Sequence, residues 1–176
     1  IGSTEDLYAK RHLVPFGEFM PFKSWLGPLA HAFEVPMSDF SRGDGAQPLL
    51  RVGSRLVGAS ICYEDAFPSE LAQALPEAQL LINVSNDAWF GDSLAPPQHL
   101  ETGRDLVRAT NTGISAVIDH RGQVLVSQPS FVRGAVSAEV TPRSGATPFV
   151  HLGNWLAVGL SLVLVLAGAW SGRHRG

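Results

Sequence analysis

One stretch near the C-terminus restricts the possible folds of this chain more than any other. Residues 152–170 read LGNWLAVGLSLVLVLAGAW, 19 positions without a charged side chain. A helix of that length measures about 28 Å at about 1.5 Å per residue, close to the thickness of a bilayer core. The segment therefore predicts a transmembrane helix over residues 151–171. A buried core helix is the alternative, although core helices of this length usually carry a polar face.

The flanks of this segment predict its orientation. Trp155 and Trp170 lie near its two ends, where indole rings favour the membrane interfaces, and Arg173 and Arg175 follow it. Positive charge after the helix predicts a cytoplasmic tail over residues 172–176. Residues 1–150 are then expected outside the cytoplasm.

Composition narrows the remaining function classes. The 176 residues are 45% hydrophobic and 16% charged with a net charge of −3, which excludes a disordered chain and argues against a nucleic-acid partner. Cys62 is the only cysteine, so neither an intrachain disulfide nor a multi-cysteine zinc site can form. The six histidines lack metal-ligand spacing, and we predict no metal and no cofactor.

Ahead of the apolar segment, short apolar runs alternate with Gly/Pro turns, which indicates a layered α/β fold. The predicted elements are strands at 7–14, 55–62 and 79–85, a short helix at 69–75, a longer helix at 97–109 with Leu100, Leu106 and Val107 inward, and a hairpin of 115–119 and 123–127 around Arg121-Gly122. These elements are too few to cover both faces of a mostly parallel sheet. We therefore expect the chain to be the C-terminal portion of a larger protein.

Residues 21–48 form a segment of a different kind. Apolar side chains, including Trp25, Leu26 and Phe33, are interspersed with four prolines. The segment is too apolar for a plain linker and too interrupted for a long helix, which favours a lid or a membrane-facing loop.

A single thiol is the first candidate for chemistry. Cys62 follows the apolar run 55–61 and precedes Pro68, a residue common in the first turn of a helix. We expect it at a strand-to-helix turn, where backbone N–H groups lower the pKa of a thiol and can hold an oxyanion. A buried, inert cysteine is the alternative.

Two polar clusters accompany the thiol. Lys10 stands in a predicted strand whose following Pro/Gly turn ends on Glu18. Asn83 begins a second cluster, in which a strand leads into a polar loop that ends in Trp89 and Phe90. The alternatives are a solvent-facing lysine and an ordinary loop with a packed tryptophan.

Four motifs together carry a family resemblance. They are YAKRHLVPFGE (8–18), ICYED (61–65), NVSNDAWFG (83–91) and RATNTGISAVID (108–119). Their order and spacing resemble the carbon–nitrogen hydrolase (nitrilase) superfamily. HLVPFGE, SNDAWFG and the GNW at 153–155 resemble, more narrowly, its apolipoprotein N-acyltransferase branch.

The resemblance implies a nitrilase-like αββα sandwich, present here in part, with the catalytic portion at residues 1–150. It implies transfer of an acyl chain from a membrane phospholipid, through a cysteine thioester, to the α-amine of a diacylglyceryl-cysteine apolipoprotein. A monomer in the bacterial inner membrane is expected, with the catalytic domain periplasmic and the C-terminus cytoplasmic.

The resemblance also implies roles for individual residues. Cys62 would be the nucleophile and Lys10 the lysine of a Glu-Lys-Cys triad, with Glu18 and Glu64 as supporting carboxylates. The expected substrate-binding or gating residues are Tyr63, Asn86, Trp89 and Phe90. The triad glutamate belongs before Lys10 in the family, and Glu5 is too close to Lys10 to replace it.

Two other functions remain open from the sequence. One is a soluble nitrilase-type amidase acting on a small amide, against which the charge-free terminal segment argues. The other is a non-catalytic remnant anchored by one helix, which the missing glutamate permits.

Overall fold

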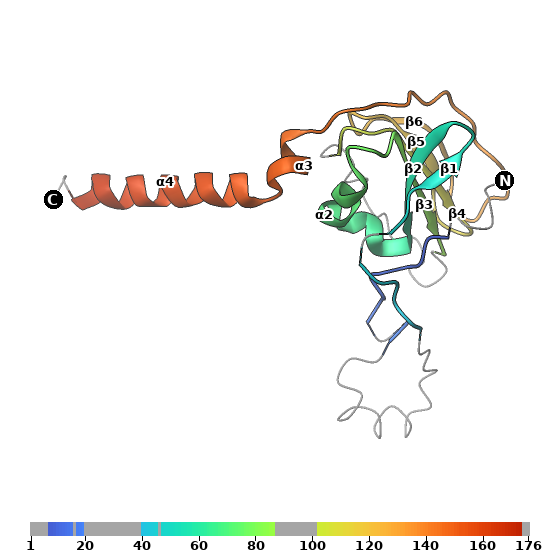
Figure 1. The fold of residues 1–176 in the computed structure, drawn as a ribbon, viewed down its shortest axis with the longest axis horizontal. Coiled ribbons are helices and arrows are strands. Elements are labelled where there is room, and N and C mark those ends of the chain that lie inside the picture. Colours follow the sequence, from blue (N-terminus) through green and yellow to red (C-terminus); the bar gives the residue numbers. More distant parts are fainter. Residues whose placement is uncertain (1–6, 16, 20–39, 46, 87–101, 174–176) are drawn as a thin grey trace, which may run out of the picture.

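The structure is a computed structural model that describes residues 7–15, 17–19, 40–45, 47–86 and 102–173 (Figure 1). Six strands in these residues form one mixed sheet in the order β1-β2-β3-β4-β5-β6. The central pairs β2–β3 and β3–β4 are parallel, and the outer neighbours are antiparallel. The strands are β1 (Leu50–Val52), β2 (Arg55–Ile61), β3 (Leu80–Ser85), β4 (Leu106–Thr110), β5 (Ser115–Ile118) and β6 (Val124–Gln128).

Three short helices connect β2 to β3, because parallel neighbours need a crossover between them. They are η1 (Cys62–Ala66), α2 (Pro68–Leu71) and η2 (Ala72–Ala74). Gly58 of β2 lets this connection pack closely on the sheet. A Cβ at Gly58 would lie 2.8 Å from Cδ2 of Leu81 and 3.0 Å from Cβ of Ala74, which is closer than side chains tolerate.

The hydrophobic core is centred on the middle of the sheet. Its buried cluster consists of Leu81, Leu106, Ala116 and Ile118, with Ile114 packed against it. Leu81 and Leu106 are register partners in the parallel pair β3–β4. The strands predicted at 55–62 and 79–85, the helix at 69–75 and the hairpin around Arg121-Gly122 are all confirmed within a few residues.

The strand predicted at residues 7–14 is wrong. This segment is extended but belongs to no sheet, and its backbone groups bind partners elsewhere. The Ala9 N–H donates to Oε1 of Gln47 at 3.0 Å, and the Lys10 carbonyl accepts the Gly43 N–H at 2.7 Å. Because side chains and a loop satisfy these groups, a neighbouring strand is not required.

The helix predicted at 97–109 is also wrong where the structure describes it. Leu106 and Val107 belong to strand β4, and residues 97–101, with Leu100, lie outside the described residues. Pairing with β3 buries Leu106 completely, and this tertiary contact outweighs a local spacing that resembles a helix.

Two buried residues just before β4 fasten the segment that leads to the C-terminal helices. Asp105 accepts the backbone N–H groups of Thr141 at 2.8 Å and of His120 at 2.9 Å. The Arg104 guanidinium donates to the carbonyl oxygens of Gly145 at 2.5 Å and Ala78 at 2.8 Å. The chain from 141 to 145 is therefore fixed to the sheet although it contains no helix or strand.

Thr147 caps the N-terminus of helix α3 (Pro148–Leu152), because its hydroxyl accepts the Val150 N–H at 3.3 Å. Helix α4 (Trp155–Arg173) then projects away from the sheet (Figure 1). Its large apolar side chains from Trp155 to Trp170 are exposed. In the described part of the chain, no helix combines the length and hydropathy that crossing a membrane requires, so the predicted transmembrane helix is not confirmed.

Candidate active site

The Cys62 thiol occupies the point where β2 ends and η1 begins, as the sequence predicts. Cys62 is buried, and its backbone has a positive φ of 57°. A residue with a Cβ adopts this left-handed conformation at a cost of about 1–3 kcal/mol, so the surrounding structure must hold it in place. Strained backbone of this kind is common at functional sites.

A polar pair on the two central strands lies directly beneath this turn. Ser60 and Asn83 are register partners in β2 and β3, and both are buried. The Asn83 amide donates to Oγ of Ser60 and to the carbonyl oxygen of Cys62, each at 3.0 Å. The second bond connects β3 directly to the backbone of the strained residue.

The Glu64 carboxylate joins the cysteine turn to the N-terminal segment. It is only 2% exposed and accepts four hydrogen bonds. They come from the backbone N–H groups of Arg11 (2.6 Å), His12 (3.0 Å) and Ile61 (2.7 Å) and from the Tyr8 hydroxyl (2.8 Å). Both oxygens of Glu64 are thus occupied by protein donors, which makes it a group that positions the site.

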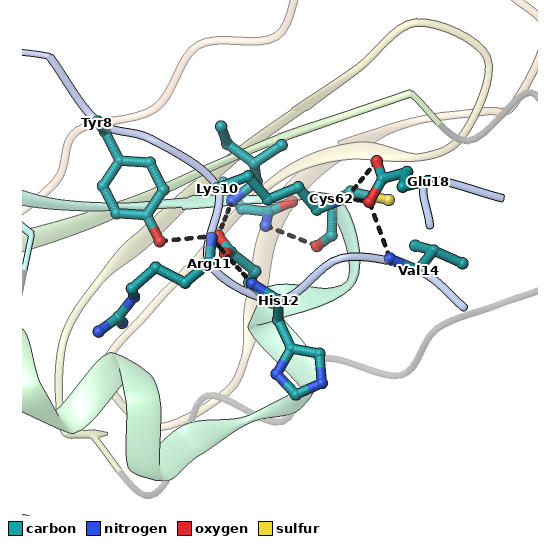
Figure 2. Close-up of polar contacts among 10 residues, drawn as sticks. Tyr8, Lys10, Arg11, His12, Val14, Glu18 and Cys62 are labelled. Atoms are coloured by element: carbon teal, nitrogen blue, oxygen red, sulfur yellow. Dashed lines mark hydrogen bonds and ion pairs between the residues drawn. The ribbon is translucent and has the colours of Figure 1, made fainter. Parts of the chain in front are cut away.

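Lys10 and Glu18 form a close ion pair beside this junction (Figure 2). The Lys10 ammonium donates to both carboxylate oxygens of Glu18 at 2.7 Å, and the Val14 N–H donates to Oε2 at 2.8 Å. The side chains are 11% and 27% exposed, respectively. Figure 2 shows the Cys62 side chain pointing toward the Glu18 end of this pair. The two bonds to Glu18 therefore hold the Lys10 ammonium at a fixed position.

Aromatic packing covers the outer side of the turn. The His12 ring stacks on Phe67 with centroids 3.8 Å apart, and Tyr63 meets both rings edge-on. Nδ1 of His12 lies 2.9 Å from Oε1 of Glu70 on α2. Tyr63, predicted to bind substrate, is thereby part of a packed aromatic group that holds the 8–12 segment against η1 and α2.

The other predicted substrate-contacting residues are placed only in part. Oδ1 of Asn86 accepts a hydrogen bond from the Asn111 amide at 2.7 Å at the end of β3. Trp89 and Phe90 lie outside the described residues, as does most of the 21–48 segment. Among the residues that are described, no group of three or more His, Cys, Asp or Glu side chains is arranged to hold a metal ion.

Sequence reasoning gave no role to Tyr8 or to the Ser60–Asn83 pair. The available signal for the pair was a polar residue inside each of two apolar strands, RLVGASI and LLINVS. A second missed contact is the ion pair between Asp65 of η1 and Arg108 of β4. This ion pair joins η1, the helical turn that begins at Cys62, to strand β4.

The family profile of the carbon-nitrogen hydrolases matches residues 2–148, which include the whole sheet and every described residue of this site. The chain belongs to the carbon–nitrogen hydrolase family. The α/β fold with a mixed sheet is the one expected for a nitrilase-like member of this family.

Several relatives of this carbon–nitrogen hydrolase are apolipoprotein N-acyltransferases. That of Nitrosomonas europaea is 46% identical over 98% of this chain and 37% of its own length. That of Methylococcus capsulatus is 44% identical over 94% of this chain and 34% of its own length. That of Pseudomonas aeruginosa is 40% identical over 94% of this chain and 34% of its own length. The chain thus spans about a third of the length of these relatives.

Solved structures give a weaker likeness. An amidase of the nitrilase superfamily from Nesterenkonia AN1, crystallised as a mutant, has a TM-score of 0.45 and 26% identity over 52% of this chain and 40% of its own. Another structure of a Nesterenkonia amidase has a TM-score of 0.48 and 22% identity, over 70% of this chain and 47% of its own.

Proposed function

We propose that this chain carries the nucleophile of an apolipoprotein N-acyltransferase. The observation that supports it most is the 46% identity to the Nitrosomonas europaea enzyme over 98% of the chain. The proposed reaction moves a fatty acyl chain from a membrane phospholipid to the N-terminal α-amine of a diacylglyceryl-cysteine apolipoprotein. The geometry around Cys62 is compatible with each of its two steps.

In the first step the Cys62 sulfur attacks the acyl carbonyl carbon of the phospholipid ester. The C–S bond forms as the ester C–O bond breaks, and the thiol proton passes through a base to the departing alkoxide. The products are an acyl-thioester enzyme and a lysophospholipid. We assign the base to the glutamate that the family pattern places before Lys10 and that these 176 residues do not contain.

In the second step the α-amine of the apolipoprotein attacks the thioester carbonyl. The C–N bond forms as the C–S bond breaks, and one amine proton returns to the Cys62 sulfur. No water, metal or redox partner is consumed, and the enzyme is restored in ping-pong fashion.

Both steps pass through a tetrahedral oxyanion that needs a fixed positive partner. We assign this role to the Lys10 ammonium, because two bonds of 2.7 Å to Glu18 hold it in one position. Glu18 is the supporting carboxylate of the lysine. Glu64 supports the site differently, because it binds the backbone of Arg11 and His12 to the cysteine turn.

We further propose that helix α4 lies in lipid and that residues 172–176 are cytoplasmic. The exposed apolar side chains along α4 support contact with acyl chains, since water would be an unfavourable surrounding for them. Cys62 would then lie on the periplasmic side of the inner membrane, in a monomer. Tyr63, Asn86, Trp89 and Phe90 are proposed to meet the acyl donor or the lipidated acceptor.

The decisive experiment incubates the complete gene product with a labelled phospholipid and a diacylglyceryl-cysteine peptide. It follows the label on the enzyme and on the peptide. Mass spectrometry should find the acyl group first on Cys62 and then on the peptide amine. Cys62→Ser is the matched control and should form no acyl-enzyme, because a hydroxyl is a far weaker nucleophile at neutral pH. Hydrolysis of a small amide without acylation of the peptide would assign the amidase function instead.

A further inference from the structure

The Asn83 side chain has an unusual place in the sheet. It is completely buried in the middle of β3, in a strand otherwise made almost wholly of apolar residues. Its two N–H donors are used, but its Oδ1 is buried and has no hydrogen-bond partner among the residues that the structure describes. A buried acceptor without a partner is unfavourable, so an apolar side chain of similar size would suit this position better if packing alone mattered.

One of the two donors has a direct connection to the nucleophile. It holds the carbonyl oxygen of Cys62 at 3.0 Å, and Cys62 is the residue whose φ of 57° departs from ordinary backbone. The other donor reaches Ser60, which in turn donates to the Ile82 carbonyl at 3.3 Å. Asn83 therefore connects the framework of two central strands to the peptide that follows the thiol.

Fixing this carbonyl also fixes a backbone donor. The Cys62 carbonyl and the Tyr63 N–H belong to one planar trans peptide, so they point in opposite directions. Tyr63 is in the first turn of η1, where N–H groups have no acceptor inside the helix. A bond from Asn83 to the carbonyl thus holds the Tyr63 N–H away from β3, available to an oxygen that develops negative charge next to Cys62.

We propose that Asn83 is a positioning residue for acyl transfer, which orients the Cys62–Tyr63 peptide so that the Tyr63 N–H and the Lys10 ammonium together stabilise the oxyanion. This inference rests on the proposed function of Cys62. It assigns Asn83 no contact with substrate. Its effect is confined to steps that pass through a tetrahedral oxyanion.

The test compares two reactions of the same thiol in the complete gene product. Acylation by an activated p-nitrophenyl ester passes through an oxyanion, whereas alkylation by iodoacetamide does not. Asn83→Leu removes both donors and the amide oxygen while keeping the branched shape and the number of heavy atoms of the side chain. We expect its acylation rate to fall by about 100-fold, the loss that a misplacement of about 1 Å can cause, while alkylation proceeds at a rate comparable to wild type.

Ser115→Ala is the control, because it removes a side-chain hydrogen bond of the same sheet, the one that Ser115 Oγ accepts from the Thr110 N–H at 3.0 Å, at a residue that binds neither Cys62 nor Asn83. Both of its rates should stay near wild type. The proposal fails if Asn83→Leu acylates normally, if acylation and alkylation fall together, or if Ser115→Ala shows the same selective loss of acylation. Asn83→Ala gives a second variant should the leucine fail to fold, and unfolding of both would make Asn83 purely structural and overturn the proposal.

Failure of the proposed function would look different. In that case the wild-type protein would form no thioester with either the ester or a phospholipid. Normal acylation of wild type with no selective effect at Asn83 contradicts the present inference alone.

Discussion

The Tyr8 hydroxyl donates a 2.8 Å hydrogen bond to Oε2 of Glu64 across 56 positions of sequence. The same carboxylate receives the Arg11 and His12 N–H groups, so one buried residue of η1 holds the N-terminal segment that carries Lys10. The relative placement of lysine and cysteine therefore depends on this carboxylate and its donors. Of these donors to Glu64, the Tyr8 hydroxyl is the one that a side-chain substitution removes.

Tyr8→Phe should make stability less dependent on alkaline pH. Burial, followed by the bond and charge of Glu64, raises the pKa of Tyr8 well above its ordinary value near 10. A raised folded-state pKa gives a stabilisation that is fully present below about pH 10 and is lost as the pH rises toward the folded-state pKa. Urea denaturation from pH 8 to 11 should show a stability difference between wild type and Tyr8→Phe that shrinks with pH. A constant difference would contradict this.

Lys10→Arg should impair acylation of Cys62 while leaving the fold intact. Arginine keeps the positive charge, but its planar fork would bind Glu18 in a bidentate manner and displace the charge from the oxyanion. We expect acyl-enzyme formation to fall by about 100-fold or more, measured by stopped-flow release of p-nitrophenol. Replacing Lys by Arg tests geometry at constant charge. The matched control is Arg55→Lys, the reverse exchange at an exposed position of β2, which should acylate normally. Near-normal acylation by Lys10→Arg would show that Lys10 does not stabilise the oxyanion.

Gly58→Ala should destabilise the sheet. The added Cβ would lie 2.8 Å from Leu81 and 3.0 Å from Ala74, so β2 or the crossover helices must shift. Overpacking of this kind lowers the free energy of unfolding by about 1–3 kcal/mol, measurable by urea denaturation. Gly159→Ala, where no atom lies within 4 Å of the new Cβ, is the control and should leave the unfolding of the sheet unchanged. Equal stability of Gly58→Ala and wild type would show that the tight packing is relieved at no cost.

Helix α4 should bind lipid through its exposed apolar surface. Leu160→Lys combined with Leu164→Lys places two charges on neighbouring turns, which should abolish co-flotation of the protein with phospholipid vesicles. Val124→Lys combined with Leu125→Lys changes two other exposed apolar residues, both in β6, and should leave flotation intact. If both double variants lose flotation, or if neither does, lipid binding does not depend specifically on α4.

The single cysteine allows the proposed orientation to be tested. A membrane-impermeant maleimide should label Cys62 in intact spheroplasts, because the proposal places it on the periplasmic side. Denatured protein gives the full labelling that serves as the reference. Labelling only after lysis would place Cys62 on the cytoplasmic side.

Local patterns were sufficient where a residue's environment is set by its neighbours in sequence. The apolar runs of β2 and β3 and the turn at Arg121-Gly122 have such patterns, and the turn holding Cys62 follows from Pro68 and the end of a strand. Contacts that join distant positions were beyond this reasoning. Residues 7–14 have the composition of a strand, yet the N–H groups of Arg11 and His12 bind Glu64, 52 or more residues away.

The same limit explains β4 and the buried pair beneath the nucleophile. Leu106 acquires its strand conformation from Leu81, its register partner on β3, and no spacing within residues 97–109 reveals that partner. Asn83 and Ser60 look like isolated polar residues until the register of β2 and β3 places them opposite one another. The contact between these two residues can be recognised only once the pairing of the strands is known.

The fastening of residues 141–145 by Arg104 and Asp105 has a mechanical consequence. Without these bonds, the stretch between β6 and α3 would be a flexible linker, and the sheet could move freely relative to α4, the helix that we propose lies in lipid. Because Thr141 and Gly145 are bound to the two residues just before β4, only Ala146 and Thr147 separate this fixed stretch from α3. In the proposed arrangement with α4 in lipid, this short connection limits how far the Cys62 thiol can move from the lipid surface.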